Sequence, residues 1–250
     1  RDPLTYRERS YRHKVQLDDL VSSHMRIQET DLHIRADRDV TLRASDLVFQ
    51  YRLQLEEYIA KTPVFSSSLA PLPMDNLAPA IVQDMLGAAE GAGVGPMAAV
   101  AGSMAYFVGK SLVEEGVAEI IVENGGDIYL NRKKECTVAI YAGASPLSYK
   151  VGVRIFPQQM PCGICTSSGT IGHSLSLGKA DSVTVLADSV ALADAAATRL
   201  GNEVGTLAGG KDGIQNALKE AENIDGIRGV IVICNDILGA YGDINLVKLD

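Results

Sequence analysis

The chain has 250 residues, 46% of them apolar, enough for one large core or two small ones. Its net charge is −8, and the acidic body of the chain has no basic stripe, which argues against a nucleic-acid partner because binding phosphates needs clustered Lys and Arg. No apolar run is long enough to cross a bilayer, and the first residues lack the apolar segment of a signal peptide. We therefore expect a cytoplasmic protein with no membrane partner.

The N-terminal part of the chain, about residues 1–60, is predicted to be rich in β-strands. Three stretches alternate apolar and polar residues with the period of two that a half-buried strand requires: 13–17, 24–31 and 32–37. From Ser45 the apolar residues recur at helical spacing, and Pro63 ends the predicted helix. We expect this part to pack on the rest of a single domain that spans residues 1–250.

Two helices are predicted after a connection rich in Pro and Ser at residues 62–75. The first, at about 76–90, has Pro79 in its first turn and apolar residues along one face. The second begins near Pro96 and ends at Gly116. Because its first half is nearly all Ala, Gly and Ser, this helix can lie against another backbone or against a ligand.

Strands dominate the second half of the sequence. They are predicted at 118–123, 127–131, 136–142, 149–155, 182–188, 229–236, 237–243 and 244–249, with helices at 189–202 and 211–221. Short polar turns between neighbouring strands indicate antiparallel pairing. Since strands and helices occur in blocks, the sequence predicts an α+β fold, with mainly antiparallel sheets and packed helices.

Two glycine-rich segments can bring a ligand against the backbone. Residues 91–102 place glycines before a helix N-terminus, where unpaired amides can donate hydrogen bonds to an anion. A close-packed turn between two helices explains the glycines equally well. In "ENGGDIYL", at 123–130, Asn-Gly-Gly predicts a hairpin turn with Asp127 at the start of the next strand. A solvated carboxylate beside an ordinary turn is the alternative.

Asp194 and Thr198 are four residues apart on a predicted helix, so their side chains share one face. The neighbouring residues are mostly Ala, and a carboxylate buried among them needs a hydrogen bond, an ion pair or a cation. Carboxylate and hydroxyl oxygens suit a hard cation such as Mg²⁺. The alternative is a solvated Asp194 and a Thr198 that bonds back to its own helix.

Cys162 and Cys165 form a C-x-x-C pair that admits a redox or a zinc site. The following residues are a poor helix start, and Cys136 and Cys234 are isolated rather than paired. On a strand the first two cysteines would also face opposite sides. We favour reduced, buried cysteines that act as small apolar residues.

The residues after this pair are rich in hydroxyl groups and glycine. Thr166, Ser167, Ser168 and Thr170, together with Gly169, form the kind of loop that binds a phosphate or the edge of a flavin ring. His173 follows and can donate to an anion or titrate near neutral pH.

Taken in order, "GPMAAVAG", "VENGGDIYL", "CTSSGTIGHSLS", "SVTVLADS" and "ADAAATRL" resemble the ApbE superfamily of FAD-dependent protein flavinyltransferases, which have a T-fold-like α+β body. Within it, the chain is most similar to a family of uncharacterised ApbE-like proteins. The resemblance covers roughly residues 77–205 and includes the N-terminal "YRERSYR".

The resemblance implies a function for each motif. The Mg²⁺ ligands would be Asp194 and Thr198, and the proton would be moved by His173 or Asp127. The residues next to a flavin or its phosphates would be Gly95, Pro96, Asn124, Gly125, Gly126, Thr166, Ser167, Ser168, Gly169 and Thr170. The implied cofactors are Mg²⁺ and FAD or a related nucleotide, and the implied partners are that small molecule and a protein acceptor. An oligomer is compatible with the sequence.

Two departures from the flavinyltransferase pattern leave the reaction open. His173 is followed by "SLSLGKAD" rather than Ile-Asp-Pro, and "AVAGS" stands in place of a Lys-Gly pair, with no Lys on this predicted helix until Lys110. Three hypotheses remain: a Mg²⁺-dependent transferase or pyrophosphatase, a non-catalytic flavin- or nucleotide-binding module, and a thiol redox or metal protein.

Overall fold

The structure, a computed structural model, describes residues 19–168, 180–204 and 210–249. The helices are α1 (Thr41–Lys61), α2 (Val64–Ser67), α3 (Ala80–Ala92), α4 (Val100–Glu114), α5 (Val190–Glu203) and α6 (Lys211–Ala221), with 3-10 turns η3 (Pro96–Ala99) and η4 (Pro157–Gln159). The strands are β1 (Val21–Ile27), β2 (Thr30–Ala36), β3 (Ile120–Asn124), β4 (Asp127–Asn131), β5 (Cys136–Ala139), β6 (Val151–Ile155), β7 (Cys162–Ser167), β8 (Ser182–Ala187), β9 (Ile227–Cys234), β10 (Ile237–Gly242) and β11 (Asn245–Lys248).

Most strands belong to one sheet of eight, in the order β1-β2-β3-β4-β7-β8-β9-β10. A second sheet has the order β11-β6-β5, and the neighbouring strands in both sheets pair antiparallel. The predicted α+β fold with mainly antiparallel sheets is therefore confirmed. The N-terminal hairpin joins the large sheet through β2 and β3, while the prediction of one domain over 1–250 stays a prediction.

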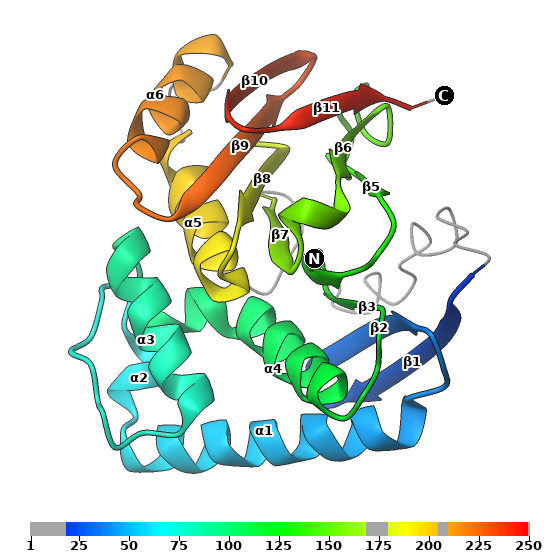
Figure 1. Cartoon of the computed structure of the whole chain (residues 1–250). Coiled ribbons are helices and arrows are strands. Elements are labelled where there is room, and N and C mark those ends of the chain that lie inside the picture. The colour runs from blue at the N-terminus through cyan, green and yellow to red at the C-terminus, as the bar shows by residue number, and fades with distance from the viewer. Residues whose placement is uncertain (1–18, 169–179, 205–209, 250) are drawn as a thin grey trace.

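The large sheet has a buried core on each face. Helices cover one face, and the three-stranded sheet covers part of the other (Figure 1). On β8, Val183 and Val185 face the helices, whereas Leu186 belongs to the core between the two sheets. Because both faces are buried, β8 and β9 read as continuous apolar runs rather than alternating ones.

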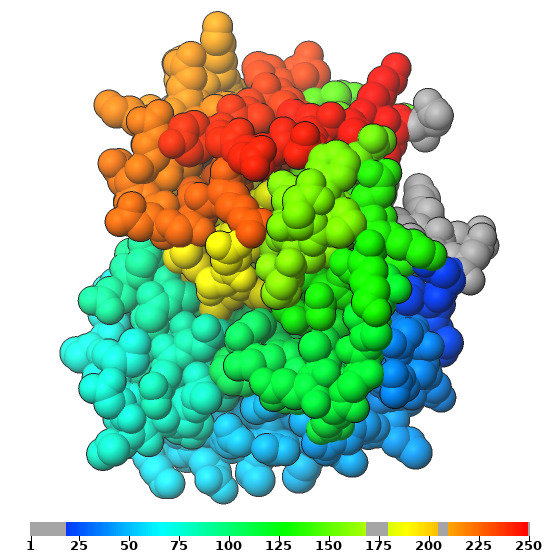
Figure 2. Space-filling model, viewed as in Figure 1, coloured from blue at the N-terminus to red at the C-terminus, as the bar shows by residue number. Residues whose placement is uncertain are grey.

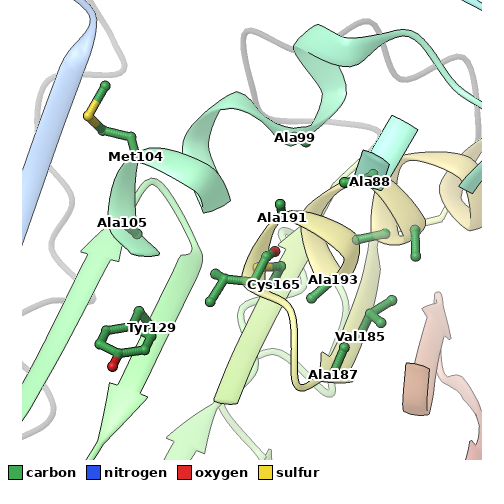
Figure 3. Close-up of a cluster of buried hydrophobic side chains, with 14 of the residues drawn as sticks. Ala88, Ala99, Met104, Ala105, Tyr129, Cys165, Val185, Ala187, Ala191 and Ala193 are labelled. Carbon is green, nitrogen blue, oxygen red and sulfur yellow. The ribbon is translucent and has the colours of Figure 1, made fainter. Parts of the chain in front are cut away.

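Small residues let the helices lie close to one another and to the sheet. Figure 3 shows Ala191 and Ala193 of α5 next to Cys165 of β7. A Cβ atom on Gly102 of α4 would lie 2.7 Å from the carbonyl oxygen of Val190 at the start of α5. The prediction that the Ala- and Gly-rich helix lies against another backbone is confirmed.

The hydroxyl-rich loop predicted from Thr166 onward was wrong at its start, because Thr166 and Ser167 belong to a strand. Cys162–Ser167 form β7, which lies in the middle of the large sheet between β4 and β8. The Gly, Ser and Thr content suggested a loop, but pairing on both edges and burial on both faces stabilise a strand there. The remaining residues of the motif, from Gly169 on, lie outside the described residues.

Other boundaries differ by a few residues. The first helix begins at Thr41 rather than Ser45, because Asp39 Oδ1 accepts hydrogen bonds from the amide and the hydroxyl of Thr41, at 2.9 and 2.7 Å. The connection at 62–75 contains the short α2. The strand predicted at 13–17 lies outside the described residues.

In the described part of the chain, no single helix is both long and apolar enough to cross a membrane. Among the described helices, only Ala80–Ala92 and Pro96–Glu114 taken together would be long and apolar enough, and the chain bends by 107° between them.

Asp84 of α3 is a partly buried acid that makes stability depend on pH. Its Oδ2 accepts a hydrogen bond of 2.9 Å from Ser103 Oγ on α4. Burial raises the pKa of Asp84 above its ordinary value, and Ser103 and Lys110 lower it only in part. An acid whose pKa is raised by folding contributes stability at low pH that is lost as the pH rises through the folded-state pKa.

We therefore predict that Asp84→Asn raises the melting temperature at pH 8 and that this gain vanishes toward pH 4, where the wild-type acid is protonated. Thermal unfolding between pH 4 and pH 8 measures the effect. Asp225→Asn is the control, because Asp225 is exposed. A constant difference between Asp84→Asn and the wild type at all pH values would contradict the prediction.

Candidate functional site

Four segments distant in the sequence meet at the first turn of α4. The amide of Gly102 donates a hydrogen bond of 2.8 Å to Asp194 Oδ2 on α5. Asn124, at the end of β3, donates through Nδ2 to the carbonyl oxygen of Ala101, at 3.2 Å. Asp127 of β4 and Cys165 of β7 complete the group, since the charges of Asp127 and Asp194 both raise the pKa of the Cys165 thiol.

The first turn of α4 makes this meeting point favourable for a carboxylate. Gly102 is the third residue of the helix, and amides in a first turn have no partner inside the helix. Asp194 supplies the acceptor from another helix and also interacts with the positive end of the α4 dipole. Asp194 is thus hydrogen-bonded and 7% exposed, and the alternative of a solvated side chain was wrong.

Asp194 and Asp127 form a buried pair of acids. Asp127 is 8% exposed, so both carboxylates are largely removed from water. Burial and the charge of Asp127 raise the pKa of Asp194 well above its ordinary value, while the amides of Gly102 and Ala101 lower it. Two buried carboxylates whose charges interact do not both stay ionised unless a cation compensates their charge. Without a cation, one of them holds a proton.

Thr198 lies one helical turn after Asp194 on the same face of α5 and is equally buried, at 7% exposure. The structure thus brings one hydroxyl and two carboxylates to neighbouring positions. Within the described residues, no group of three or more His, Cys, Asp and Glu side chains is arranged to hold a metal. A cation here would need water or a ligand to complete its coordination.

The turn at Asn124–Asp127 has the predicted form. Asn124 and Asp127 are register partners, and the two central glycines have φ values of 72° and 112°, which glycine adopts without strain. A Cβ atom on Gly126 would lie 3.5 Å from the carbonyl oxygen of Thr166, so the turn lies against the end of β7. Since Asn124 and Asp127 are both buried, Asp127 is not the solvated carboxylate of the alternative interpretation.

The strand divides the hydroxyl groups of "CTSSG" between its two faces. Thr166 shares its face with Cys162 and Ile164, and its Oγ1 lies 2.9 Å from Oγ1 of Thr184 on β8. Ser167 shares the face of Cys165, which is the face of the two carboxylates. Ser168 follows β7, while Gly169, Thr170 and His173 lie outside the described residues.

Gly95 and Pro96 have a packing function in this fold. A Cβ atom on Gly95 would overlap the carbonyl group of Ser68, so the glycine lets the chain after α2 pass directly over η3. Pro96 is buried at the first position of η3. Close packing therefore explains Gly95, and its contact with a phosphate stays a prediction.

The four cysteines are free and buried, as predicted. Cys162 belongs to the core between the sheets and Cys165 to the core under the helices, so they face opposite sides of β7. Burial raises the pKa of Cys136 to about 11 and that of Cys162 to about 12, and also raises the pKa of Cys165. Protonated thiols on opposite faces do not form a C-x-x-C redox or zinc site.

Sequence reasoning missed two members of this site. The amide of Gly102 was not identified as the partner of Asp194, although the run of Ala and Gly at the start of α4 is the signal of a helix that others approach closely. Nothing in the sequence indicated that Cys165 lies beside Asp127 and Asp194, because that contact depends on β7 being a strand.

We predict that Gly102→Ala destabilises the protein by about 1–3 kcal/mol, the usual cost of overpacking a core. The added methyl group would lie 2.7 Å from the Val190 carbonyl oxygen and 2.8 Å from Asp194 Cβ, which pushes α5 away from α4. Urea unfolding measures the change. In the control, Gly87→Ala inside α3, the methyl group meets only Met74 Cε at 3.6 Å, so the variant is as stable as the wild type or more stable. Equal stability of Gly102→Ala and the wild type would disprove the close-packing argument.

Comparisons with known proteins agree with this fold. The solved flavin transferase ApbE of Vibrio cholerae is similar with a TM-score of 0.51 at 16% identity, covering 89% of this chain and 96% of that one. The apo flavinyl transferase ApbE of Pseudomonas stutzeri is similar with a TM-score of 0.55 at 14% identity, covering 89% and 94%. At such identities the likeness shows the fold, and it confirms the expected ApbE-like architecture.

Sequence comparison gives the family. A UPF0280 protein of Methanococcus aeolicus is 40% identical over 235 residues, which cover 92% of this chain and 94% of the relative. A UPF0280 protein of Methanocaldococcus jannaschii is 42% identical over 231 residues, covering 90% and 92%. The family model described as "AbpE bacteria" matches residues 12–246. The chain therefore belongs to this ApbE-like family.

Proposed function

We propose that this protein binds a flavin nucleotide, or another nucleotide with a pyrophosphate, together with Mg²⁺ held by Asp194 and Thr198 next to Asp127. The observation that carries the proposal is the pair of buried carboxylates from β4 and α5, which meet at the first turn of α4. The family and the fold shared with flavin transferases support a role that involves a flavin.

The charge of the site favours a divalent cation. Asp127 and Asp194 would bring two negative charges into a buried site, where a lone ionised carboxylate is strongly unfavourable. Mg²⁺ prefers oxygen ligands, and it commonly binds one or two protein carboxylates while water and substrate phosphates complete its octahedron. The two carboxylates and the hydroxyl of Thr198 therefore fit Mg²⁺ better than a softer metal, which would need more protein ligands.

The surrounding backbone suits a ligand that carries phosphate groups. The turn at Gly125 and Gly126 has no side chains, and Ser167 adds a hydroxyl on the same face of β7 as Cys165. Asn124 is held by Ala101, which keeps the turn next to α4. When bound, Mg²⁺ would neutralise a pyrophosphate and stabilise the charge on a leaving phosphate. In this proposal His173 or Asp127 moves the proton.

Binding and catalysis are separable in this proposal. In the flavinyltransferases that this chain resembles, the glycine-rich helix start carries a Lys-Gly pair, whereas residues 99–103 here read "AVAGS" and the amide of Gly102 engages Asp194. The residues proposed to hold the cation are present, but the start of α4 has no cationic side chain. A binding module without turnover is thus the second candidate, and the protein acceptor belongs only to the first.

We predict that FAD and Mg²⁺ together raise the melting temperature more than the sum of their separate effects. A ligand at one hundred times its dissociation constant adds about 2.7 kcal/mol of stability, which a thermal shift assay detects easily. Asp194→Asn should abolish the effect of Mg²⁺, since the amide loses the charge while its oxygen still accepts from Gly102. Asp84→Asn, the same change at a partly buried acid on α3, is the matched control and should keep the effect. An unchanged Mg²⁺ effect in Asp194→Asn, or no effect of FAD on the wild type, would refute the proposed site.

Product analysis separates the two candidates. After incubation with FAD and Mg²⁺, release of AMP, with FMN free or attached to an added acceptor protein, identifies a transferase or pyrophosphatase. Binding of FAD without release of AMP identifies the non-catalytic module. The same assay on Thr198→Val, which removes the hydroxyl at nearly constant shape, is expected to lower the apparent Mg²⁺ affinity in either case.

A further inference from the structure

Three polar side chains stand in line across β1, β2 and β3, and the proposed function uses none of them. Ser22 Oγ lies 2.7 Å from Nε2 of His33. The other ring nitrogen of His33, Nδ1, lies 3.9 Å from Oε2 of Glu123. A hydroxyl, an imidazole and a carboxylate in this order are the parts of a nucleophile, its base and the group that orients the base.

The strand register explains why these side chains meet. His33 is the register partner of Glu123, so the two side chains share one face of the sheet. His33 also pairs with His24 on β1, and Ser22, two residues earlier, is its diagonal neighbour on the same face. The next residue on β3, Asn124, bonds to α4, so Glu123 points away from the helices. The three side chains therefore lie on the face opposite Asn124.

The exposure of each side chain suits its role. Ser22 is exposed, so a substrate in solution can reach its hydroxyl. The side chains of His33 and Glu123 are only 13% and 11% exposed, which limits the motion of the imidazole and strengthens its interaction with the carboxylate. In Figure 1, β1 lies at the right-hand edge of the molecule, and in Figure 2 its blue atoms reach the surface there.

The position of Glu123 also selects the useful tautomer of His33. A carboxylate beside Nδ1 favours the imidazole with its proton on that nitrogen, which leaves Nε2 to accept the proton of the Ser22 hydroxyl. The distance of 3.9 Å is longer than a hydrogen bond, as is common for catalytic groups before a substrate binds.

Strand β1 supplies a donor for the negative charge that forms when an ester is attacked. Among the described residues, β1 is an edge strand of the large sheet. Ile27 and Thr30 flank a two-residue turn and pair with each other, so hydrogen-bonded pairs recur at every second residue from Ile27 back to Ser23. Ser22 falls between these pairs, so its amide points away from β2. An amide beside the nucleophile can donate to the oxyanion.

We propose that Ser22, His33 and Glu123 form a second site, which hydrolyses carboxylic esters with an accessible acyl carbon. Ser22 Oγ bonds to the acyl carbon while its proton passes to His33 Nε2, and His33 gives that proton to the alcohol oxygen as the ester bond breaks. Water then attacks the acyl-serine, and its proton passes through His33 to Ser22 Oγ as the carboxylic acid leaves. Glu123 is a positioning residue that touches no reacting atom.

Hydrolysis of p-nitrophenyl acetate in the presence of EDTA tests the proposal, because no step uses a metal. The wild type should release p-nitrophenolate, and Ser22→Ala and His33→Gln should each lower kcat about a hundredfold, which is the low end for loss of a positioned proton-transfer group. Ser22 is exposed, so an unchanged melting temperature confirms that Ser22→Ala folds.

The control variant is His24→Ala, which removes an exposed histidine from the same face. His24 Nε2 lies 2.8 Å from Asp31 Oδ1, outside the line of Ser22 and His33, and the variant should keep the wild-type rate. A wild type no faster than Ser22→Ala, or a His24→Ala variant that loses as much activity as His33→Gln, would overturn the proposal.

The role of Glu123 is tested by Glu123→Gln, which should lower kcat about tenfold and leave KM unchanged, because Glu123 orients the base without touching the ester. A fluorophosphonate probe should label Ser22 of the wild type, as located by peptide mass spectrometry, and label His33→Gln at least about tenfold more slowly. Labelling at another serine, or Glu123→Gln with the wild-type kcat, would contradict the assignment.

Discussion

The candidate site depends on one contact, the hydrogen bond from the amide of Gly102 to the carboxylate of Asp194. It joins α4 to α5, and it forms only because Gly102 has no Cβ atom to strike the Val190 carbonyl group. With α5 held at this distance, Asp194 reaches the hairpin turn that carries Asp127. The small residues of α4 and α5 are thus a requirement of the site as much as of the core.

The same contact explains why a carboxylate is tolerated among alanines. The first turn of α4 offers unpaired amides and the positive end of a helix dipole, which together stabilise one negative charge. They do not stabilise a second negative charge, and the carboxylate of Asp127 adds one beside Asp194. Without a cation, one of the two acids therefore holds a proton, and a cation bound there, as proposed above, would stabilise the folded chain.

The sequence was sufficient for features that depend on neighbouring residues. The Asn-Gly-Gly turn, the helical spacing of Asp194 and Thr198 and the apolar character of the cysteines follow from local chemistry, and most helices and strands were predicted within a few residues. Strand β7 was missed because its Gly and Ser content favours a loop, and only pairing with β4 and β8 makes it a strand. The Gly102 contact joins residues 92 positions apart, and no local pattern specifies such a pair.

The start of α4 offers no positive side chain to compensate the two carboxylates, because residues 99–103 read "AVAGS" and the first lysine on this helix is Lys110. A lysine at position 101 would bring a positive charge to the first turn of α4, whose amide already binds Asp194. With alanine there, position 101 contributes no charge against Asp127 and Asp194. Compensation of the second negative charge then falls to a proton or, as proposed above, to a bound Mg²⁺.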